Sequence, residues 1–570
     1  MKLMINSHNK LSFFIFDIIK VNLIFKELRL SKRFITYMLV PYYLFTLINA
    51  LLEGLCMFLL VSIFTVESLA NANNLPEYIL DIVNALGGEI NFPDILPILV
   101  FLFGLNILLR FTLLVFIEVL GVKLRQKLQE GIFKNFLMGK WSLMKNFRIG
   151  DAIGTNTQEA ILVAKYIQSS VNVFYYLISM SVTFFMVIAA SLKFSLILGF
   201  IALPIIFCMQ KVVVLQAKFS KRSALLRNQF SADIIDRLNG LLQVHADDNY
   251  NYHIKHGIKS QSSLAHTDIL IAFCQAAIGS FNLLVPFVGL ICLLIGIYYF
   301  KVGDTINFSL LAGVSFLGLK ILSNLNNLVS TFGTLSRLSG SLEPVLKALS
   351  ITPILKRTLI KEKIKSIYLY NVSYSYDNLK VISGINLKIT KGSPLIITGR
   401  SGKGKTTLVN IITGLYMPQG GRIIYQGISG KKYLTTKNSA RIGFVIQDIY
   451  LFEGSIRDNL LAGRDYTDDR IWEVLDQIDA SDFVKNIGGL DAKVSEAGRS
   501  FSGGQRRRLG IARVLLSNSD ILIFDEVTAG LDKANKTAII KLIECLSKSY
   551  LVIIISHTPL EIRHQKYFAL

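Results

Sequence analysis

Residues 399–410 read GRSGKGKTTLVN, which contains the pattern G-x-x-x-x-G-K-[ST] of a phosphate-binding loop. The glycines let backbone N–H groups converge on a phosphate, Lys405 neutralises phosphate oxygens, and the Thr406 hydroxyl is placed to ligate Mg²⁺. The apolar run Pro394–Thr398 predicts a buried strand before the loop, and Leu408–Leu415 predicts a helix that opens at the phosphates. The stretch therefore predicts an α/β domain that binds a nucleoside triphosphate.

Two strand-like runs downstream end in side chains suited to phosphate chemistry. Ile521–Glu526 (ILIFDE) is an apolar run that ends in two carboxylates. Asp525 suits the shell of Mg²⁺, and Glu526 suits a base that polarises the attacking water. Val552–His557 (VIIISH) is a second buried run that ends in a histidine, placed for a γ-phosphate contact.

Two more motifs lie between the loop and these runs. Phe444–Asp448 (FVIQD) places Gln447 at the end of a strand. Phe501–Gln505 (FSGGQ) opens a basic helix, RRRLGIARVLL. A helix that begins with small residues presents backbone N–H groups to a phosphate, so this motif predicts a second phosphate contact.

The first 340 residues differ in composition, because they hold long runs with few charges. About 20 apolar residues cross a membrane as a helix, and six runs qualify as spans. They are Phe34–Val66, Ile95–Ile117, Tyr166–Leu192, Phe194–Gln210, Ile269–Phe300 and Thr305–Ser336. Buried helices of a soluble protein are shorter and carry a polar stripe, which argues against that alternative.

The net charge of +22 follows from membrane orientation, and nucleic-acid binding is not expected. Lysine and arginine gather in Lys2–Arg33, Lys123–Lys165 and Lys211–Lys259, whereas Glu67–Asp94 contains five acidic residues and neither basic type. This asymmetry places the acidic segment outside and both termini in the cytoplasm. The five cysteines form no C-x-x-C pair and predict neither a disulfide framework nor a metal site.

The long inner connectors predict two helical hairpins that project into the cytoplasm, with tips near Gly150–Glu159 and Asp236–Ala246. The predicted domains are a cytoplasmic or interfacial segment (1–33), a transmembrane domain (34–340), a linker (341–365) and a nucleotide-binding domain (366–570). The fold class is therefore multi-domain: an all-α six-helix transmembrane domain followed by an α/β P-loop NTPase domain.

The motifs together resemble those of the ATP-binding cassette (ABC) transporters, and within them the exporter-type half-transporters with six spans. FSGGQ is similar to the family signature LSGGQ, with Phe501 for leucine. Asp525–Asp532 (DEVTAGLD) resembles the family run DEATSALD, with Gly530 in a usual alanine position, and Val494–Gly498 (VSEAG) resembles an exporter element. Tyr376 stands where the family stacks an aromatic ring on adenine.

The resemblance implies ATP and Mg²⁺ as cofactors and assigns roles by position. Glu526, His557 and Gln447 would be catalytic, and Thr406, Gln447 and Asp525 would surround the metal. The nucleotide would contact a larger set: Tyr376, Gly399, Arg400, Ser401, Gly402, Lys403, Gly404, Lys405, Thr406, Thr407, Ser502, Gly503, Gly504, Gln505 and Asp532. Residues 502–505 would complete the site of the opposite subunit, so that two chains sandwich two ATP molecules.

The implied function is an ATP hydrolase coupled to transport, which exports or flips an amphipathic or lipidic substrate by alternating access. The expected assembly is a homodimer, or a heterodimer with a related half-transporter, in the bacterial inner (plasma) membrane with the ATPase domain in the cytoplasm. An importer on the same fold stays open, while a gated channel and a soluble cassette protein are disfavoured. The chain ends 13 residues after His557, sooner than family members generally do.

Three charged residues inside the spans are the candidates for substrate contact: Glu53, Arg110 and Lys320. Charges in the hydrocarbon are costly and often functional. One interpretation is a structural pair of Glu53 with Arg110 beside a snorkelling Lys320. The other is a polar, cationic wall that meets an anionic head group. The run LINALLEGLCMFLLV around Glu53 loosely resembles flippases of lipid-linked oligosaccharides.

Overall fold

The computed structural model describes most of the chain in two compact units. The described residues are 20–26, 28, 39–56, 92–144, 149–190, 192–299, 308–352, 357–376, 379–400, 402–495, 498, 500–528, 533–557, 560, 562 and 564–570. Most of the acidic segment that we expect outside the membrane therefore lies outside the described residues. One unit comprises 1–139 and 143–353, and the other comprises 140–142 and 354–570.

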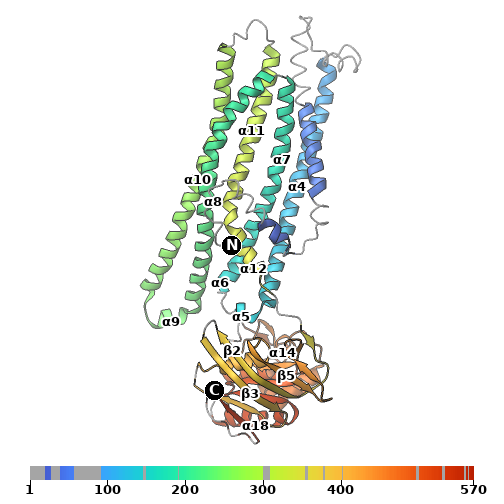
Figure 1. The fold of residues 1–570 in the computed structure, drawn as a ribbon, viewed down its shortest axis with the longest axis vertical. Coiled ribbons are helices and arrows are strands. Elements are labelled where there is room, and N and C mark those ends of the chain that lie inside the picture. The colour runs from blue at the N-terminus through green and yellow to red at the C-terminus, as the bar shows by residue number, and fades with distance from the viewer. Residues whose placement is uncertain are drawn as a thin grey trace. The chain divides into compact units, whose positions relative to one another are not determined.

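The first unit is built from long helices (Figure 1). After helix Leu39–Cys56 come α4 (Phe92–Met138), α6 (Ile149–Gly154) and α7 (Ala160–Ala190), with a π-helical turn, η1 (Thr155–Glu159), before α7. The short helix α5 (Trp141–Met144) follows α4 in the sequence, and its residues are divided between the two units. Helix α7 is followed by α8 (Leu192–Asn239), α9 (Leu241–Ala246), α10 (Tyr250–Tyr299), α11 (Phe308–Leu338), a 3₁₀ turn η3 (Ser339–Ser341) and α12 (Leu342–Leu349).

Several of these helices are apolar enough to cross a membrane. Within the described residues, three have the required length and composition: Leu39–Cys56, Leu96–Met138 and Ile149–Met186. At about 1.5 Å per residue, the 48 residues of α8 extend for about 70 Å, more than twice the thickness of the hydrocarbon. Helices of this length must continue well beyond a bilayer, as the expected hairpins require.

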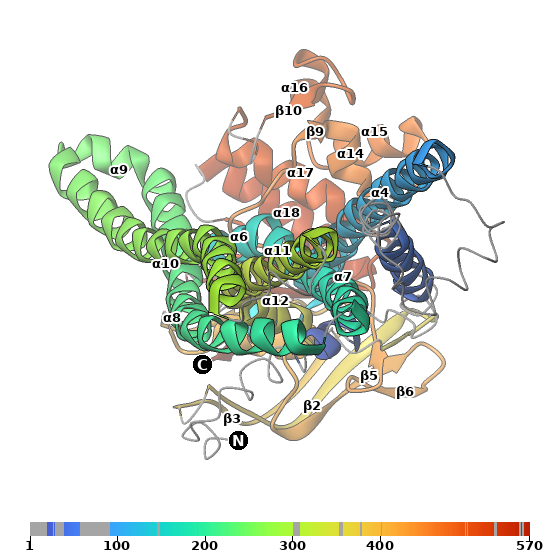
Figure 2. The same cartoon turned by 90° about the horizontal axis from the view of Figure 1, so that it is seen from above.

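The first hairpin turns earlier in the sequence than expected. α4 ends at Met138, and the residues expected at the tip, Gly150–Glu159, are helical in α6 and η1. The tip was expected there from the length of the connector, but Gly150 packs so closely on α8 that an added Cβ would lie 2.6 Å from the Cα of Ala232. The second tip lies as expected, since α9 joins α8 to α10, which run side by side in Figures 1 and 2.

A buried ionic network fixes the helices of this unit to one another. The Glu159 side chain is fully buried, and its Oε1 accepts a hydrogen bond of 3.0 Å from Nη1 of Arg227 on α8. Arg227 also donates to Ser223, whose hydroxyl donates to Asp268 on α10 at 2.7 Å. Because breaking a buried pair leaves an uncompensated charge, this network holds η1, α8 and α10 in one arrangement.

The second unit has two main sheets. The antiparallel sheet has the order β3-β2-β5-β6, from β2 (Ile364–Tyr376), β3 (Leu379–Thr390), β5 (Gly420–Gly427) and β6 (Lys432–Leu434). The parallel sheet has the order β13-β4-β12-β11-β8, from β4 (Leu395–Thr398), β8 (Ile442–Val445), β11 (Ile521–Asp525), β12 (Leu551–Ile555) and β13 (Lys566–Ala569). Two short pairs join β1 (Thr358–Leu359) to β7 (Asn438–Ser439) and β9 (Gly454–Ser455) to β10 (Lys493–Val494).

Helices cover the parallel sheet, whose central strands are buried on both faces. They are α13 (Lys405–Ile412), α14 (Ile456–Leu461), α15 (Asp468–Gln477), α16 (Ser481–Asn486), α17 (Gly503–Leu515) and α18 (Lys533–Ser549). One apolar core contains α14 to α18, and another lies between the two main sheets around α13. The expected fold class, a helical domain followed by an α/β domain, is confirmed.

Candidate nucleotide site

The site is formed by four parallel strands that end at one edge of a sheet. β4, β12, β11 and β8 are consecutive neighbours, so their carboxyl ends lie side by side. β4 leads into the phosphate-binding loop, β12 is followed by His557, β11 by Glu526, and β8 by Gln447. Ligands of open α/β sheets bind beyond the carboxyl ends of the strands, so the topology gathers the predicted residues where a ligand is expected.

The loop needs glycine where it meets the helix. Gly404 is the N-cap of α13 and has a φ of 97°, a left-handed conformation that favours glycine. A Cβ on Gly404 would lie 2.7 Å from Cγ1 of Val381 on β3, so there is no room for a side chain either. The helix begins at Lys405, three residues before the predicted start, and its first N–H groups face the loop.

Lys405 is held by the loop from which it arises. Its side chain is buried, and its Nζ donates to the carbonyl oxygen of Gly399 at 2.8 Å and to that of Arg400 at 3.3 Å. The same Nζ lies 3.4 Å from Nδ1 of His557. These two carbonyl partners hold the ammonium group at the position where the loop would receive a phosphate.

Glu526 is fixed on both of its carboxylate oxygens. Gln447 donates from Nε2 to Oε2 at 3.0 Å, and Nε2 of His557 lies 2.6 Å from Oε1. Glu526 has a φ of 49°, and its N–H donates to the carbonyl of Ile555 at 3.1 Å, which ties it to the neighbouring strand. A strained backbone at a carboxylate held this way is typical of functional positions.

The contacts of His557 are consistent with one neutral tautomer. If Nε2 carries the proton, it donates to Glu526 and leaves Nδ1 as an acceptor for Lys405. His557 thus connects the carboxylate to the ammonium. The network runs from Gln447 through Glu526 and His557 to Lys405. Its first three members follow the ends of β8, β11 and β12, and Lys405 begins α13.

Asp525 is the most electrostatically perturbed carboxyl of the site. Burial, together with the charge of the adjacent Glu526, raises its pKa to about 6, although Lys405 and His557 act in the opposite direction. Two neighbouring carboxylates in a partly buried position favour the binding of a cation. The arrangement therefore fits the metal shell expected from sequence, with Asp525 as its anionic member.

Tyr376 belongs to a group of three tyrosines beside the loop helix. Its hydroxyl lies 3.3 Å from Oγ1 of Thr407, and its ring meets that of Tyr374 edge-on at 5.2 Å. The Tyr374 ring stacks on Tyr416 with a centroid distance of 5.3 Å. Tyr374 lies two residues before Tyr376 on the same strand, so the two-residue period of a strand places both side chains on one face and could have predicted this contact. Tyr416 is distant in the sequence and meets the other two rings only in the folded structure.

The FSGGQ motif begins α17 as expected. Ser502 caps the helix: its hydroxyl accepts from the N–H of Gln505 at 3.2 Å, and its own N–H donates to the Gln505 side chain at 2.9 Å. Phe501 is buried in the apolar core, which explains a large side chain there. Among the described residues, no hydrogen bond or ion pair joins 502–505 to the loop around Lys405.

The remaining expected contacts divide into two groups. Arg400, Gly402, Lys403 and Thr406 are exposed around the loop, where a ligand can reach them. Ser401 and Asp532 lie outside the described residues, as does Gly530.

The charges inside the spans pair differently from the expectation. Lys320 on α11 donates to Oε1 of Glu53 on helix Leu39–Cys56, so the proposed pair of Glu53 with Arg110 is wrong and Lys320 does not snorkel. A lysine in the hydrocarbon is stabilised more by an opposite charge on the neighbouring helix than by reaching for the interface. Arg110 is exposed and has no ion pair with any residue that the structure describes.

Comparison with known proteins finds a matching sequence family and similar relatives. Residues 382–529 match the sequence family described as ABC transporter. Two Staphylococcus aureus proteins, named as multidrug export ATP-binding/permease proteins, are each 38% identical to the chain, over 207 and 198 residues. The first alignment covers 36% of this chain and 36% of the relative, and the second covers 34% of each, so the chain matches about a third of the length of these curated relatives.

The fold is similar to that of a solved structure over nearly the whole chain. A bacterial Atm1-family ABC exporter with ATP bound gives a TM-score of 0.74, covering 93% of this chain and 92% of that chain at 18% identity. At this identity the likeness concerns the fold alone.

Proposed function

Because the chain joins an ABC transporter ATP-binding domain to a helical domain with the fold of an exporter, we propose that it is an ATP-driven membrane transporter. It would export or flip an amphipathic or lipidic substrate by alternating access. The observation that carries the proposal is the network from Gln447 through Glu526 and His557 to Lys405 beside a phosphate-binding loop. Such a network would position a base for nucleotide hydrolysis. The attached apolar helices would lie in a membrane, where the energy of hydrolysis would drive transport.

ATP would bind with its phosphates in the loop and its adenine against Tyr376. The phosphate oxygens would replace the carbonyl oxygens that now accept from Lys405, while the N–H groups of Gly402 to Thr407 would surround the β-phosphate. Arg400 and Lys403 are exposed on the same loop, and Ser401 would contact the nucleotide with them. The hydroxyl of Tyr376 already lies beside α13 through Thr407, which favours a ring position close to the loop.

Asp525, with the hydroxyl of Thr406 and the amide oxygen of Gln447, would hold Mg²⁺. These are oxygen ligands of the kind that the ion prefers. When bound, the ion neutralises charge that develops on the transferred phosphoryl group. Asp525 offers a partly buried carboxylate beside a second one, which fits a divalent cation.

Glu526 would accept hydrogen bonds from the attacking water and orient it toward the γ-phosphate. Its carboxylate is held at both oxygens, so it is positioned before ATP arrives. His557 would keep Glu526 in place before ATP binds, and its ring would exchange one of its two present contacts for the γ-phosphate. Fixing a base and a water in line with the phosphate is the main contribution that a protein makes to phosphoryl transfer.

The transporter would be a dimer whose two ATP molecules lie between subunits. Ser502, Gly503, Gly504 and Gln505 begin a helix and make no hydrogen bond to the loop of their own chain within the described residues, which leaves them available to a nucleotide bound by a partner. Asp532 would lie at the same interface. Glu526 and His557 are both present, which favours a homodimer over a heterodimer with a degraded site.

The membrane domain would comprise residues 34–340 with six spans, after an interfacial segment, 1–33, and before a linker, 341–365, and the ATPase domain, 366–570. The basic inner segments favour the bacterial inner membrane with the ATPase domain in the cytoplasm. Glu53, Arg110 and Lys320 would line the substrate path. Because Glu53 and Lys320 neutralise one another, Arg110 is the cation left to meet an anionic head group.

The test is ATP-driven transport by the full chain in proteoliposomes with the ATPase domain facing outward. A panel of fluorescent lipids, lipid-linked glycans, peptides and drugs is screened first for stimulation of ATPase activity in nanodiscs. We expect at least one amphipathic anion to stimulate hydrolysis and to be moved away from the ATPase side. Movement toward that side would establish the importer instead, and conductance without hydrolysis would contradict a transporter.

A further inference from the structure

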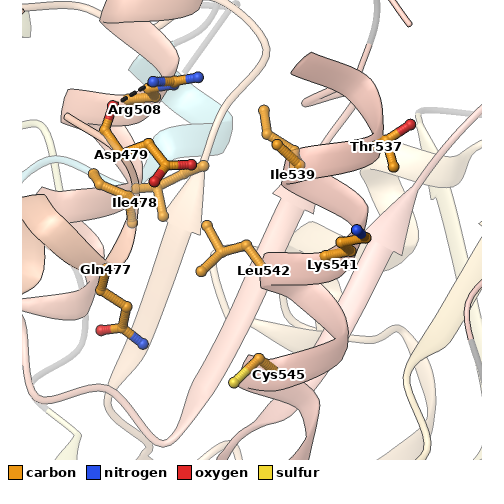
Figure 3. Close-up of a pocket in the computed structure, with 11 residues that line it drawn as sticks. Gln477, Ile478, Asp479, Arg508, Thr537, Ile539, Lys541, Leu542 and Cys545 are labelled. Carbon is orange, nitrogen blue, oxygen red and sulfur yellow. Dashed lines mark hydrogen bonds between the residues drawn. The ribbon is translucent and has the colours of Figure 1, made fainter. Parts of the chain in front are cut away.

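The ATP-binding unit contains a cavity of about 810 Å³ whose lining residues are all separate from the nucleotide site (Figure 3). One wall is the end of α15 and the residues that follow it, Gln477 to Asp479. The second wall is α17, through Arg508 and Ile511, and the third is α18, from Thr537 to Cys545. The volume is in the range of cavities that hold small organic ligands.

Part of the cavity lining is apolar. The side chains of Ile478, Ile511 and Ile539 are buried where they line it. Leu542 extends from α18 into the space between the walls, as Figure 3 shows. An apolar base of this kind favours a ligand with an apolar body, because each contact removes hydrocarbon surface from water.

The rim of the cavity carries more positive than negative charge. Arg508 donates to the backbone carbonyl of Asp479, which fixes the wall that these two residues form. Lys541 lies on α18 across the cavity and forms no ion pair with any residue described. The carboxylate of Asp479 is the acidic group among the lining residues, which also include the two cations Arg508 and Lys541.

We propose that this cavity is a binding site for small amphipathic anions, with Ile478, Ile539 and Leu542 around the apolar body and with Lys541 and Arg508 near the anionic group. The negative charge of Asp479 repels an anion, so we expect the affinity of the cavity for the anion to be modest. An anion would thus prefer this site over a neutral or cationic molecule of the same shape.

Binding would restrain the ATPase because of the helices that form the walls. α17 begins at Ser502, and α18 follows the strand that ends in Asp525. A ligand in contact with both helices resists any change in their relative position. If hydrolysis requires such a change, the ligand lowers turnover in proportion to occupancy.

The experiment uses Cys545 as a reporter in the full chain, in nanodiscs of zwitterionic lipid. Cys545 is exposed and lines the cavity, whereas Cys56 and Cys274 are buried and serve as internal references. Alkylation by N-ethylmaleimide is followed by mass spectrometry with three probes of one shape: 1-naphthoate, 1-naphthalenemethanol and 1-naphthylmethylammonium. We expect 1-naphthoate to slow alkylation about fivefold at about four times its dissociation constant, and the other two to protect far less.

Variants test the charges. Lys541→Gln should weaken protection by 1-naphthoate about two- to fivefold, while Asp479→Asn should strengthen it to a similar extent. Lys548→Gln, an exposed lysine of the same helix outside the cavity, is the matched control and should have no effect. ATP turnover should fall with 1-naphthoate, and Lys541→Gln should shift the inhibition curve together with the protection curve.

Three results would overturn the proposal. Equal protection by all three probes would show that charge has no role. Unchanged protection in both Lys541→Gln and Asp479→Asn would remove these residues from the site, and full reactivity of Cys545 at every soluble concentration would show that the cavity binds no such anion. Protection without any change in turnover would contradict the restraint on the ATPase.

Discussion

The Nε2 atom of His557 lies 2.6 Å from Oε1 of Glu526, although 31 positions separate the two residues along the chain. The contact exists because β11 and β12 are adjacent parallel strands and each residue follows the end of its strand. With Gln447 on the other oxygen, the carboxylate is held at one position relative to the phosphate-binding loop.

Glu526→Gln should preserve ATP binding and remove most hydrolysis. The amide has the shape of the carboxylate and keeps the contact positions of Gln447 and His557, but it loses the negative charge that polarises water. We expect turnover to fall by about 10²-fold or more, measured as phosphate release at saturating ATP. Glu473→Gln, on the exposed face of α15, is the control. Turnover within about twofold of the wild type would exclude Glu526 as the base.

Chains with Ser502→Arg and chains with Lys405→Ala should complement one another. In a mixed dimer, one site carries both lesions and the other none, if Ser502 acts across the interface. When the sites act independently, an equal mixture should recover about a quarter of the wild-type ATPase activity, while each parent alone is inactive. Ser549→Arg, at the exposed end of α18, is the matched control for the added charge.

If the mixture shows no complementation, either both sites must act together or Ser502 does not act across the interface. Crosslinking distinguishes these two explanations. Ser502→Cys should form a disulfide with Ser401→Cys of the partner in the presence of ATP. A crosslink without restored activity would mean that both sites must act together. Neither a crosslink nor activity would contradict the placement of Ser502 at the partner's nucleotide.

Removing one member of the Glu53 and Lys320 pair should destabilise the membrane domain. Glu53→Gln or Lys320→Gln leaves an uncompensated charge among the helices, which costs about 3–5 kcal/mol. The double variant removes both charges and should regain most of the loss, measured as the melting temperature in detergent. Losses that simply add in the double variant would show that the two residues do not interact.

Arg110→Gln should leave folding intact and alter the response to substrate. Arg110 is exposed and has no ion pair among the described residues, so replacing it leaves no acidic side chain without its partner. If it meets an anionic head group, basal ATPase activity persists while stimulation by the anionic substrate disappears. The dose response in nanodiscs measures this. A melting temperature lowered as much as in Lys320→Gln would instead make Arg110 structural.

The apparent affinity for Mg²⁺ should fall as the pH drops through about 6. Burial raises the pKa of Asp525 to about 6, so below that pH the metal must displace a proton, and affinity should fall about tenfold per pH unit. Titrations of Mg²⁺-dependent ATP binding between about pH 5 and 7.5 test this. ATP itself titrates in the same range, and Asp525→Asn reports that contribution alone. The same pH dependence in both proteins would exclude Asp525 as the titrating ligand.

Local sequence determined the separate parts of this protein. Uninterrupted apolar runs produce helices long enough for a membrane, and a glycine-rich loop between a buried strand and a helix produces a phosphate site, because both depend on neighbours within a few positions. The strands before Lys405, Glu526 and His557 were predicted on the same basis. The expected tip at Gly150–Glu159 was wrong because it was placed from the length of the connector alone, whereas these residues are helical and Gly150 packs on α8.

Tertiary structure decided which of these parts meet. The order β4-β12-β11-β8 is set by crossover connections, and it alone brings His557 to Glu526 and to Lys405. In the helical domain, the sequence contains two cations in predicted spans that could pair with Glu53, and the packing of the helices places Lys320 rather than Arg110 beside it. Charge pairing inside a membrane depends on which helices are adjacent, and adjacency follows from the packing of whole helices, which no short stretch of sequence encodes.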